Sequence, residues 1–385
     1  MSLNEQAAGA IEHVREELIS LSHFIHAHPE LGYEEFESSA ALAETLETWG
    51  FDVERESAGL ATAFRATKGA GDFHVTFCAE YDALPDVGHA CGHNIIATSS
   101  LGAALGLGAV ADELNLRVTL LGTPSEEGGG GKIDLLNAGY FDDEHMALMV
   151  HPFASERLDA ICLAVEHFDV IYTGKEAHAS AAPWLGINAL DALTIAQVAL
   201  GLLRQQLPPG DQFHGIVTEG GSAANIIPSR VAGRFMVRAA SAGRLAQLRE
   251  RVNACFGAGA LATGAHLEIV ELGHPFSHME SDADILTHYR HAAEALGRSF
   301  ALDDEETPRP TISTDMANVS LVIPSIHPLL MIPTNGAVNH QPEFAAASIT
   351  GAADQAVIDG AVALATTAIA VAHDAPLRKR LMNRS

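Results

Sequence analysis

The apolar positions in the first half of the chain change between helical and strand-like patterns. Apolar residues three and four positions apart predict a helix over residues 5–27. Further helices are predicted at residues 37–49, which Gly50 closes, at the Ala-, Leu- and Gly-rich stretch 95–111, and at residues 133–139. Short apolar runs between them predict strands at residues 74–79, 116–122 and 147–151. Because apolar strands separated by helices are typical of a sheet covered on both sides, this part predicts an α/β fold with helices on both faces.

The pattern changes after about residue 166. The predicted order there is strand, helix, strand, strand, helix and strand, at residues 167–174, 188–206, 214–221, 230–240, 244–256 and 266–273. This order is typical of the ferredoxin-like arrangement. From about residue 282 the pattern is α/β again. The sequence therefore predicts one domain formed by residues 1–166 and 282–385, with a ferredoxin-like α+β domain inserted at residues 167–281.

The charge of the chain argues against two classes of partner. Its 385 residues include 49 acidic and 22 basic side chains, a formal net charge of −27 at pH 7. Such a surface repels nucleic acid and anionic membranes, so neither is expected as a partner. Apolar residues make up 48% of the chain, which allows a large core. The longest apolar stretch, residues 361–372, is too short for a membrane span and predicts a buried helix.

The cysteines and the N-terminal segment predict a cytoplasmic protein. Cys78, Cys91, Cys162 and Cys255 lack the dense, regular spacing of a disulfide framework. The first residues are amphipathic and acidic, without the basic start and apolar run of a secretion signal.

Several side chains with metal-binding chemistry follow the predicted strands. Cys91 and His93 are two residues apart, and in an extended turn a thiolate and an imidazole at this spacing can face one point and suit zinc. Such a pair alone is more often structural. His151 ends another predicted strand, and His340 lies in Asn-His-Gln-Pro. Any single one of the 20 histidines is more often structural than a ligand, and only the combination favours a metal site.

Two adjacent carboxylates, Glu126 and Glu127, come directly after the strand at residues 116–122, and four glycines follow them. Ligands bind at this end of the strands in open α/β sheets. An isolated Glu-Glu pair is more often a solvated turn. The glycines favour function, because they let the backbone approach a ligand closely. Two neighbouring carboxylates are tolerated when one binds a cation and the other handles protons.

These residues lie in motifs that together resemble the metallopeptidase family of aminoacylase, succinyl-diaminopimelate desuccinylase and related carboxypeptidases. Within it, the chain is most similar to the amidohydrolase branch of auxin-conjugate hydrolases, aminobenzoyl-glutamate hydrolases and aminoacylase-like dipeptidases. The matching motifs are HAHPELGYEE at 26–35, EYDALPDVGHACGHN at 80–94, PSEEGGGG at 124–131, HP at 151–152, GKEAHAS at 174–180, NIIP at 225–228, STDMANVS at 313–320 and NHQPEF at 339–344. Asn94 and Glu80-Tyr81-Asp82 depart from the auxin-conjugate hydrolases, which weakens a transfer of that specificity.

The resemblance implies a zinc-peptidase-like catalytic domain and an inserted lid and dimerisation domain in a homodimer. It implies that two divalent ions, zinc or manganese with cobalt as a further option, are bound by Cys91, His93, Glu127, His151 and His340. Cys91 stands where relatives carry a bridging aspartate. Glu126 would be the general base, which agrees with the chemical need for one free carboxylate beside a metal site.

The resemblance also implies roles for residues of the insert. His178 would reach the active site of a neighbouring subunit and stabilise the oxyanion. Asn225 and Arg238 would hold the polar end of the substrate, although Arg230 or Arg234 could serve instead of Arg238. A loop histidine and surface arginines are the alternative without function.

Other positions keep two interpretations each. Asp82 either orients a metal-bound histidine or caps a turn. Ser313, Thr314 and Asp315 either line the pocket or cap a helix. Trp184 contacts an acyl group or packs the insert.

The sequence thus predicts a metal-dependent amidohydrolase that cleaves the amide bond of an N-acyl amino acid or a dipeptide-like small molecule. Hydrolysis of a C–N bond in an aromatic amine or amidine remains as an alternative on the same site. A non-catalytic, metal-stabilised binding protein is disfavoured, because it would not need Glu126 beside Glu127.

Overall fold

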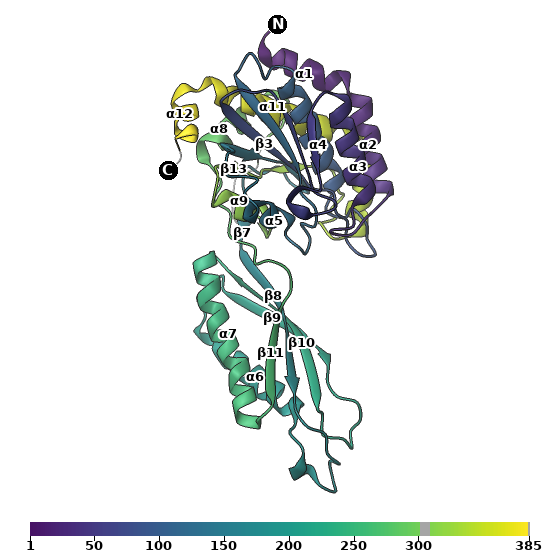
Figure 1. Cartoon of the computed structure of the whole chain (residues 1–385), viewed down its shortest axis with the longest axis vertical. Coiled ribbons are helices and arrows are strands. Elements are labelled where there is room, and N and C mark those ends of the chain that lie inside the picture. Colours follow the sequence, from purple (N-terminus) through teal and green to yellow (C-terminus); the bar gives the residue numbers. More distant parts are fainter. Residues whose placement is uncertain (301–308, 384–385) are drawn as a thin grey trace. The chain divides into compact units, whose positions relative to one another are not determined.

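The chain forms two compact units in the computed structural model, which describes residues 1–300 and 309–383. Unit 1 comprises Met1–Ile161 and Met279–Ser385, and unit 2 comprises Cys162–His278 (Figure 1). The predicted boundaries lie after residues 166 and 281 instead. Val165, which precedes the first predicted boundary, exchanges backbone hydrogen bonds with Phe276 of unit 2.

Unit 1 is built on a mixed sheet of six strands. Its order is β1-β2-β4-β3-β5-β13, in which the last four strands are parallel and the first two are antiparallel to their neighbours. The strands are β1 (Asp52–Arg55), β2 (Phe64–Lys68), β4 (Leu116–Gly122), β3 (Phe73–Ala79), β5 (Met146–Leu148) and β13 (Ser325–Ile326). Two short strands, β6 (His151–Phe153) and β14 (Leu329–Met331), form a separate parallel pair.

Helices cover both faces of this sheet, as predicted. Side chains alternate along β3, so Val75 and Phe77 pack in the larger core with α4 and α11, whereas Cys78 packs in a smaller core with α5 and α9. The helices of unit 1 are α1 (Leu3–His13), α2 (Arg15–Ala27), α3 (Phe36–Thr48), α4 (His93–Gly108), α5 (Gly131–Asn137), α8 (Ala283–Ala295), α9 (Met316–Ser320), α10 (Pro342–Ala347), α11 (Gly351–His373) and α12 (Ala375–Met382).

Most predicted bounds differ from the structure by a few residues, and the following differences change an element. The helix predicted over residues 5–27 is divided at Val14, which has non-helical backbone angles. The strand predicted over residues 147–151 is two strands, β5 and β6. The helix predicted to begin at residue 95 begins at His93, because Gly92 with a φ of 75° provides the turn directly before it.

One helix of the described chain, α11, is long and apolar enough to cross a membrane by length and composition. However, 72% of its apolar stretch is buried inside the protein, and it packs along α4. These contacts are typical of a core helix.

Unit 2 has the element order predicted for the insert. The elements are β8 (Ala164–Thr173), α6 (Ala189–Leu203), β9 (Gln212–Glu219), β10 (Arg230–Ala239), α7 (Ala242–Thr263) and β11 (His266–Glu271). The strands form an antiparallel sheet in the order β11-β8-β10-β9. Alternate residues of β8, including Phe168 and Tyr172, share a core with α6 and α7, which cover one face (Figure 1). Two short strands, β7 (Ile161–Cys162) and β12 (Thr311–Ile312), pair with each other.

The packing around β3 can be tested by Phe77→Ala, which should lower the free energy of unfolding of unit 1 by about 3–5 kcal/mol because it leaves a cavity in a fully buried position. Denaturant titration in a Trp184→Phe background measures this effect, since Trp49 of unit 1 is then the single tryptophan. Phe36→Ala is the matched control. Its side chain is 56% exposed, and the loss should stay below about 1 kcal/mol. Equal losses in both variants would contradict the assigned core.

Candidate metal centre

The parallel pairing of β3 and β4 places two groups of acidic residues side by side. Ala79 and Gly122 are register partners at the carboxyl ends of these strands. Glu80 and Asp82 follow the first strand, and Glu126 and Glu127 follow the second. Side chains after neighbouring parallel strands meet at the same edge of the sheet, so this edge concentrates carboxylates.

Cys91 and His93 are presented by a tight turn that requires glycine. Gly92 between them has a φ of 75°. A Cβ atom at Gly92 would lie 2.6 Å from Cγ of Pro152, so the turn packs directly against the residue after His151. The glycine therefore provides both the left-handed backbone and the close approach of the two segments.

His340 is brought to the same place by a backbone hydrogen bond. Its N–H donates to the carbonyl oxygen of Ala90 at 2.9 Å, directly before Cys91. His340 has a φ of 72°, a left-handed conformation that is uncommon for a residue with a side chain. Strained backbone of this kind concentrates at functional sites.

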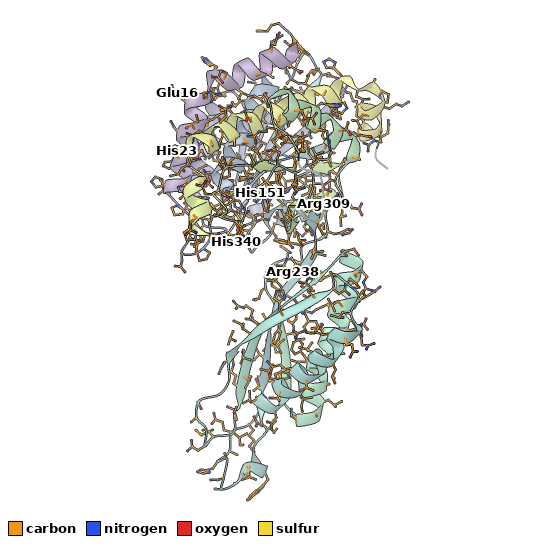
Figure 2. The ribbon with its side chains drawn as sticks, turned by 180° about the vertical axis from the view of Figure 1, so that it is seen from behind. Glu16, His23, His151, Arg238, Arg309 and His340 are labelled. Carbon is orange, nitrogen blue, oxygen red and sulfur yellow. The ribbon has the colours of Figure 1, made fainter. Side chains whose placement is uncertain are left out.

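All five predicted ligands fall into two triads that share one residue. The possible ligand atoms of Cys91, His93 and His151 lie within 4.8 Å of one another, and so do those of Cys91, Glu127 and His340. Figure 2 shows His151 and His340 at the same end of unit 1. The sulfur atom of Cys91 is common to both triads, so a cation at either one would lie within its reach.

The donor atoms of these triads fit a cation. Nε2 of His93 and Oε1 of Glu127 are buried and have no hydrogen-bond partner within residues 1–300 and 309–383. These two atoms lie 3.8 Å apart, and Nε2 of His340 lies 3.6 Å from Oε2 of Glu127. Buried polar atoms normally have partners, so unpaired nitrogen and oxygen atoms that converge beside a thiol indicate ligands of a divalent ion.

Asp82 contacts two residues of the cluster, His93 and Glu127. Its carboxylate lies 2.9 Å from Nδ1 of His93 and accepts the backbone N–H of Glu127 at 2.9 Å. Burial opposes a charge on His93, but the neighbouring Asp82 outweighs it and holds the pKa of this imidazole well above its ordinary value. The contact directs Nε2 of His93 into the cluster, as carboxylates behind metal-binding histidines do.

Glu126 has the environment of a proton acceptor. It is 6% exposed, and its Oε2 lies 3.9 Å from Nε2 of His93. Burial, together with the negative charges of Glu80 and Glu127, raises its pKa well above the ordinary value of a carboxyl group. Such a shift makes a carboxylate a stronger base, which suits proton transfer near neutral pH.

The three residues predicted to contact substrate lie in unit 2, and two of them are neighbours. The segment with His178 runs antiparallel to the segment with Asn225, where the N–H of Ala179 donates to the carbonyl oxygen of Asn225 at 2.9 Å. Asn225 is exposed, and His178 belongs to an exposed loop. Arg238 lies near the end of β10, and Asn225 precedes its start at Arg230. At about 3.3 Å per residue, the strand places Arg238 about 26 Å from Arg230.

The two alternative arginines are engaged by carboxylates within unit 2. Arg234 makes two hydrogen bonds to Asp169, at 2.8 and 3.0 Å, and Arg230 pairs with Glu219. Arg238 is half-buried, and burial lowers the pKa of its guanidinium.

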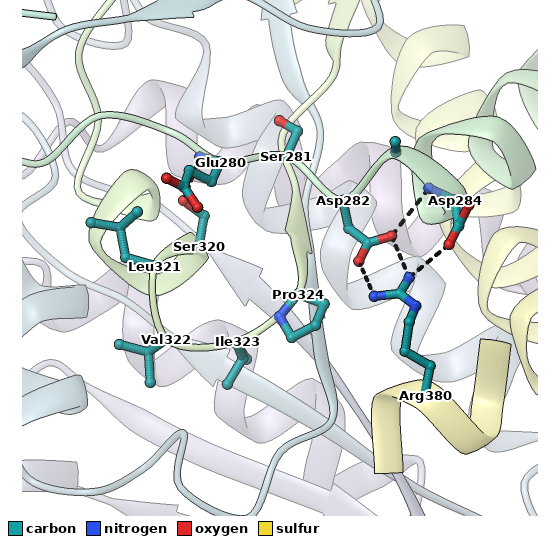
Figure 3. A pocket seen from close by; sticks show the side chains of 11 residues that line it. Glu280, Ser281, Asp282, Asp284, Ser320, Leu321, Val322, Ile323, Pro324 and Arg380 are labelled. Atoms are coloured by element: carbon teal, nitrogen blue, oxygen red, sulfur yellow. Dashed lines mark hydrogen bonds and ion pairs between the residues drawn. The ribbon is translucent and has the colours of Figure 1, made fainter. Parts of the chain in front are cut away.

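A surface pocket of about 540 Å³ elsewhere in unit 1 shares no residue with the two triads. Its charged wall is an ion-pair cluster, in which Arg380 contacts Asp282 at 2.8 Å and Asp284 at 3.0 Å (Figure 3). Asp282 also caps α8 through the backbone N–H groups of Asp284 and Ile285. These groups tie α12 to α8, which gives this pocket a structural explanation.

Comparison with known proteins identifies the family. The model of peptidase family M20/M25/M40 matches residues 76–358, well over half of the chain. The chain is 39% identical to a Xaa-Arg dipeptidase of Mus musculus, over 96% of this chain and 89% of that protein. It is 30% identical to a chain of the p-aminobenzoyl-glutamate hydrolase of Escherichia coli, over 67% of this chain and 58% of that one.

The chain belongs to peptidase family M20/M25/M40. Its fold agrees with a solved structure from Bacillus subtilis, described as a dinuclear metal binding peptidase from the M20 family. The TM-score is 0.69 at 20% identity, over 93% of this chain and 99% of that one. The predicted resemblance and the predicted class, a metallopeptidase-type amidohydrolase, are confirmed.

Three charged residues of this M20 family member form a buried cluster that the sequence reasoning missed. Nζ of Lys132 lies 2.5 Å from Glu80 and 2.7 Å from Asp315, and all three side chains are fully buried. Oε2 of Glu80 lies 3.6 Å from Nε2 of His93, so the cluster adjoins the metal site. The sequence signal for this cluster was Lys132, a charged residue in the short helix that begins at the end of the four glycines.

Asp315 does not cap α9 with its side chain, which was one of its two predicted roles. Its carboxylate accepts hydrogen bonds from the backbone N–H and the ammonium group of Lys132. The hydroxyl of Thr314 accepts the N–H of Met316 at the start of α9, which is the capping role.

Lys132→Met should lower the free energy of unfolding of unit 1 by about 3–5 kcal/mol, because it leaves two buried carboxylates without a cation. The same tryptophan-based titration measures this loss. Arg55→Met removes an ion pair whose side chains are 42% and 47% exposed, and it should cost less than about 1 kcal/mol. A Lys132→Met protein as stable as the Arg55→Met protein would refute the buried cluster.

Proposed function

We propose that this protein hydrolyses the amide bond of a dipeptide or an N-acyl amino acid with two divalent ions and Glu126 as the general base. The observation that carries the proposal is the position of Glu126, a buried carboxylate with a raised pKa beside two triads that share Cys91. The relatives are named as a dipeptidase and as a hydrolase of an N-acyl amino acid, which supports the same bond type.

The metal ligands would be Cys91, His93 and His151 for one ion, and Cys91, Glu127 and His340 for the other. The mixture of sulfur, nitrogen and oxygen donors suits zinc, and manganese or cobalt fits the carboxylate-containing triad. When bound, such ions polarise the amide carbonyl and lower the pKa of water.

The remaining steps belong to the side chains of the chain itself. Glu126 accepts a proton as a water oxygen bonds to the amide carbon. It then donates that proton to the amide nitrogen as the C–N bond breaks, which releases the amine. Asp82 keeps His93 oriented throughout, because its carboxylate holds Nδ1 of that ring.

We infer that the preferred substrates include dipeptides with a basic C-terminal residue. The Xaa-Arg dipeptidase name belongs to the relative, and the identity of 39% over 96% of this chain supports the transfer. The net charge of −27 attracts a cationic substrate, which is consistent with this class.

Glu126→Gln should abolish turnover, with a loss of at least about a hundredfold, because the amide cannot accept the proton. The measurement is hydrolysis by metal-loaded protein of a panel that contains Xaa-Arg dipeptides, other dipeptides, N-acyl amino acids and aminobenzoyl-glutamate. Metal content is determined in parallel and should be unchanged. Glu113→Gln, at an exposed position, serves as the control and should retain full activity.

Turnover in the Glu126→Gln variant at the wild-type rate would contradict the assigned base. If wild-type protein with bound metal turns over no member of the panel, the proposed amide specificity fails.

We further propose that the protein is a homodimer formed by unit 2. Strand β9 lies at the edge of the sheet, all its residues except Phe213 are exposed, and two of them are Ile216 and Val217. On α6, Val198 and Leu202 are 60% and 73% exposed and four residues apart on the same side of the helix. Arg204, directly after α6, lies over the ring of Phe213, so α6 ends beside β9.

An unprotected edge strand beside an exposed apolar helix stripe is rare in a monomer, and pairing with a second copy would cover both. In such a dimer, His178 and Asn225 would be delivered to the partner's active site, as the family resemblance implies. The antiparallel contact between their segments supports a joint role.

Leu202→Glu should shift the protein from dimer to monomer, because it buries a charge in the interface. Activity should fall with it, since His178 then reaches no site. Light scattering coupled to gel filtration measures the mass. Leu261→Glu, at an 88% exposed leucine of α7, is the matched control and should remain dimeric. A wild-type protein that is monomeric and active would refute the dimer.

A further inference from the structure

Glu35 is a fully buried carboxylate in the N-terminal motif, outside the two triads. Both of its oxygens are used, since Oε1 accepts the backbone N–H of Ser125 and Oε2 accepts the hydroxyl of Thr62, each at 2.8 Å. Ser125 directly precedes Glu126. A carboxyl group from a distant part of the sequence thus holds the backbone next to the proposed base.

Gly32 and Tyr33, which precede Glu35, contact the same loop. A Cβ atom on Gly32 would lie 2.3 Å from Oγ and 3.1 Å from Cα of Ser125, so the backbone of Gly32 lies directly against Ser125. The ring of Tyr33 lies against Gly129, where a Cβ atom would come within 2.2 Å of the ring, and the Tyr33 hydroxyl donates to Asp134 at 2.6 Å. The segment at residues 32–35 therefore packs against one side of the loop at residues 125–129 and restricts its movement.

The loop needs such a constraint because its conformation is costly. Ser125 has a φ of 56°, in the left-handed region that non-glycine residues rarely occupy. Backbone strain of this kind persists only where surrounding contacts enforce it. The carbonyl oxygen of Ser125 accepts the N–H groups of Gly129 and Gly130, so the strained residue closes the loop that carries Glu126 and Glu127.

We propose that Glu35 is a positioning residue for catalysis, which fixes the strained backbone of Ser125 and thereby aims the carboxylate of Glu126. The role rests on the proposed function of Glu126. Glu35 acts through the backbone of Ser125 and belongs to neither triad.

The contact requires an oxygen atom at position 35 that accepts the N–H of Ser125, and this atom need not carry a full charge. Burial, with the negative charge of Asp82, raises the pKa of Glu35 to about 7. A glutamine side chain fits the same partners, because its oxygen accepts the N–H of Ser125 and its NH2 group donates to Thr62. The structure therefore predicts rescue by Gln and loss in Ala.

The kinetic test compares Glu35→Ala and Glu35→Gln with Glu34→Ala, an exposed glutamate one residue earlier. In metal-loaded protein, Glu35→Ala should lower kcat by about 10- to 100-fold with a nearly unchanged KM, since displacement of a catalytic group reduces turnover more than binding. Glu35→Gln and Glu34→Ala should stay within about threefold of wild type, and metal content should be equal in all four proteins.

The second measurement needs no activity. Hydrogen exchange in the peptide that covers residues 124–131 should be about tenfold faster in Glu35→Ala, because the Ser125 amide loses its acceptor. It should remain at the wild-type rate in Glu35→Gln. If Glu35→Ala does not fold, Thr62→Val frees the carboxylate from its other partner and should change kcat and exchange in the same direction.

Unchanged exchange and kcat in Glu35→Ala would overturn the proposal, and so would a Glu35→Gln protein as impaired as Glu35→Ala. Loss of metal in Glu35→Ala would also overturn it, because the effect would then pass through the ligands. If wild-type protein cleaves no panel substrate, the proposed function fails, whereas the exchange result still decides whether Glu35 fixes the loop.

Discussion

The carboxylate of Asp82 joins the two strand ends on which the site depends. One oxygen contacts the ring of His93, and the other accepts the backbone N–H of Glu127. His93 at the start of α4 and Glu127 after β4 are thereby both held by Asp82. Loss of the Asp82 carboxylate would release a ligand from each triad, because His93 belongs to the first triad and Glu127 to the second.

The charges around Asp82 explain why the site fits cations. Glu80, Asp82, Glu126 and Asp315 are nearly or completely buried, and the buried ammonium group of Lys132 contacts two of them. Carboxylates at such density repel one another, which contributes to the raised pKa of Glu126. Two divalent ions on the triads would balance the remaining charge and leave Glu126 free to carry a proton.

The parts of this structure that depend on local pattern were predictable. The short apolar runs of β3 and β4 predicted two strands of the sheet. The motifs predicted Cys91 and His93 as ligands, and the structure brings them together with Glu127, His151 and His340. Contacts between distant side chains were not predictable. Lys132 and Asp315 are 183 residues apart, and Glu35 and Ser125 are 90 residues apart, so no local period relates them. The break at Val14 was missed because both helices share one apolar periodicity.

The central claim is a two-ion centre with Cys91 as the shared ligand. The most direct measurement is the number of metal ions bound per chain, determined by elemental analysis after loading with zinc or manganese and removal of excess ion. The account predicts two ions for the wild type, one for His151→Ala and one for His340→Ala. Cys91→Ser should weaken both ions together. One ion in the wild type, or a Cys91→Ser protein that retains two ions at wild-type affinity, would contradict the account.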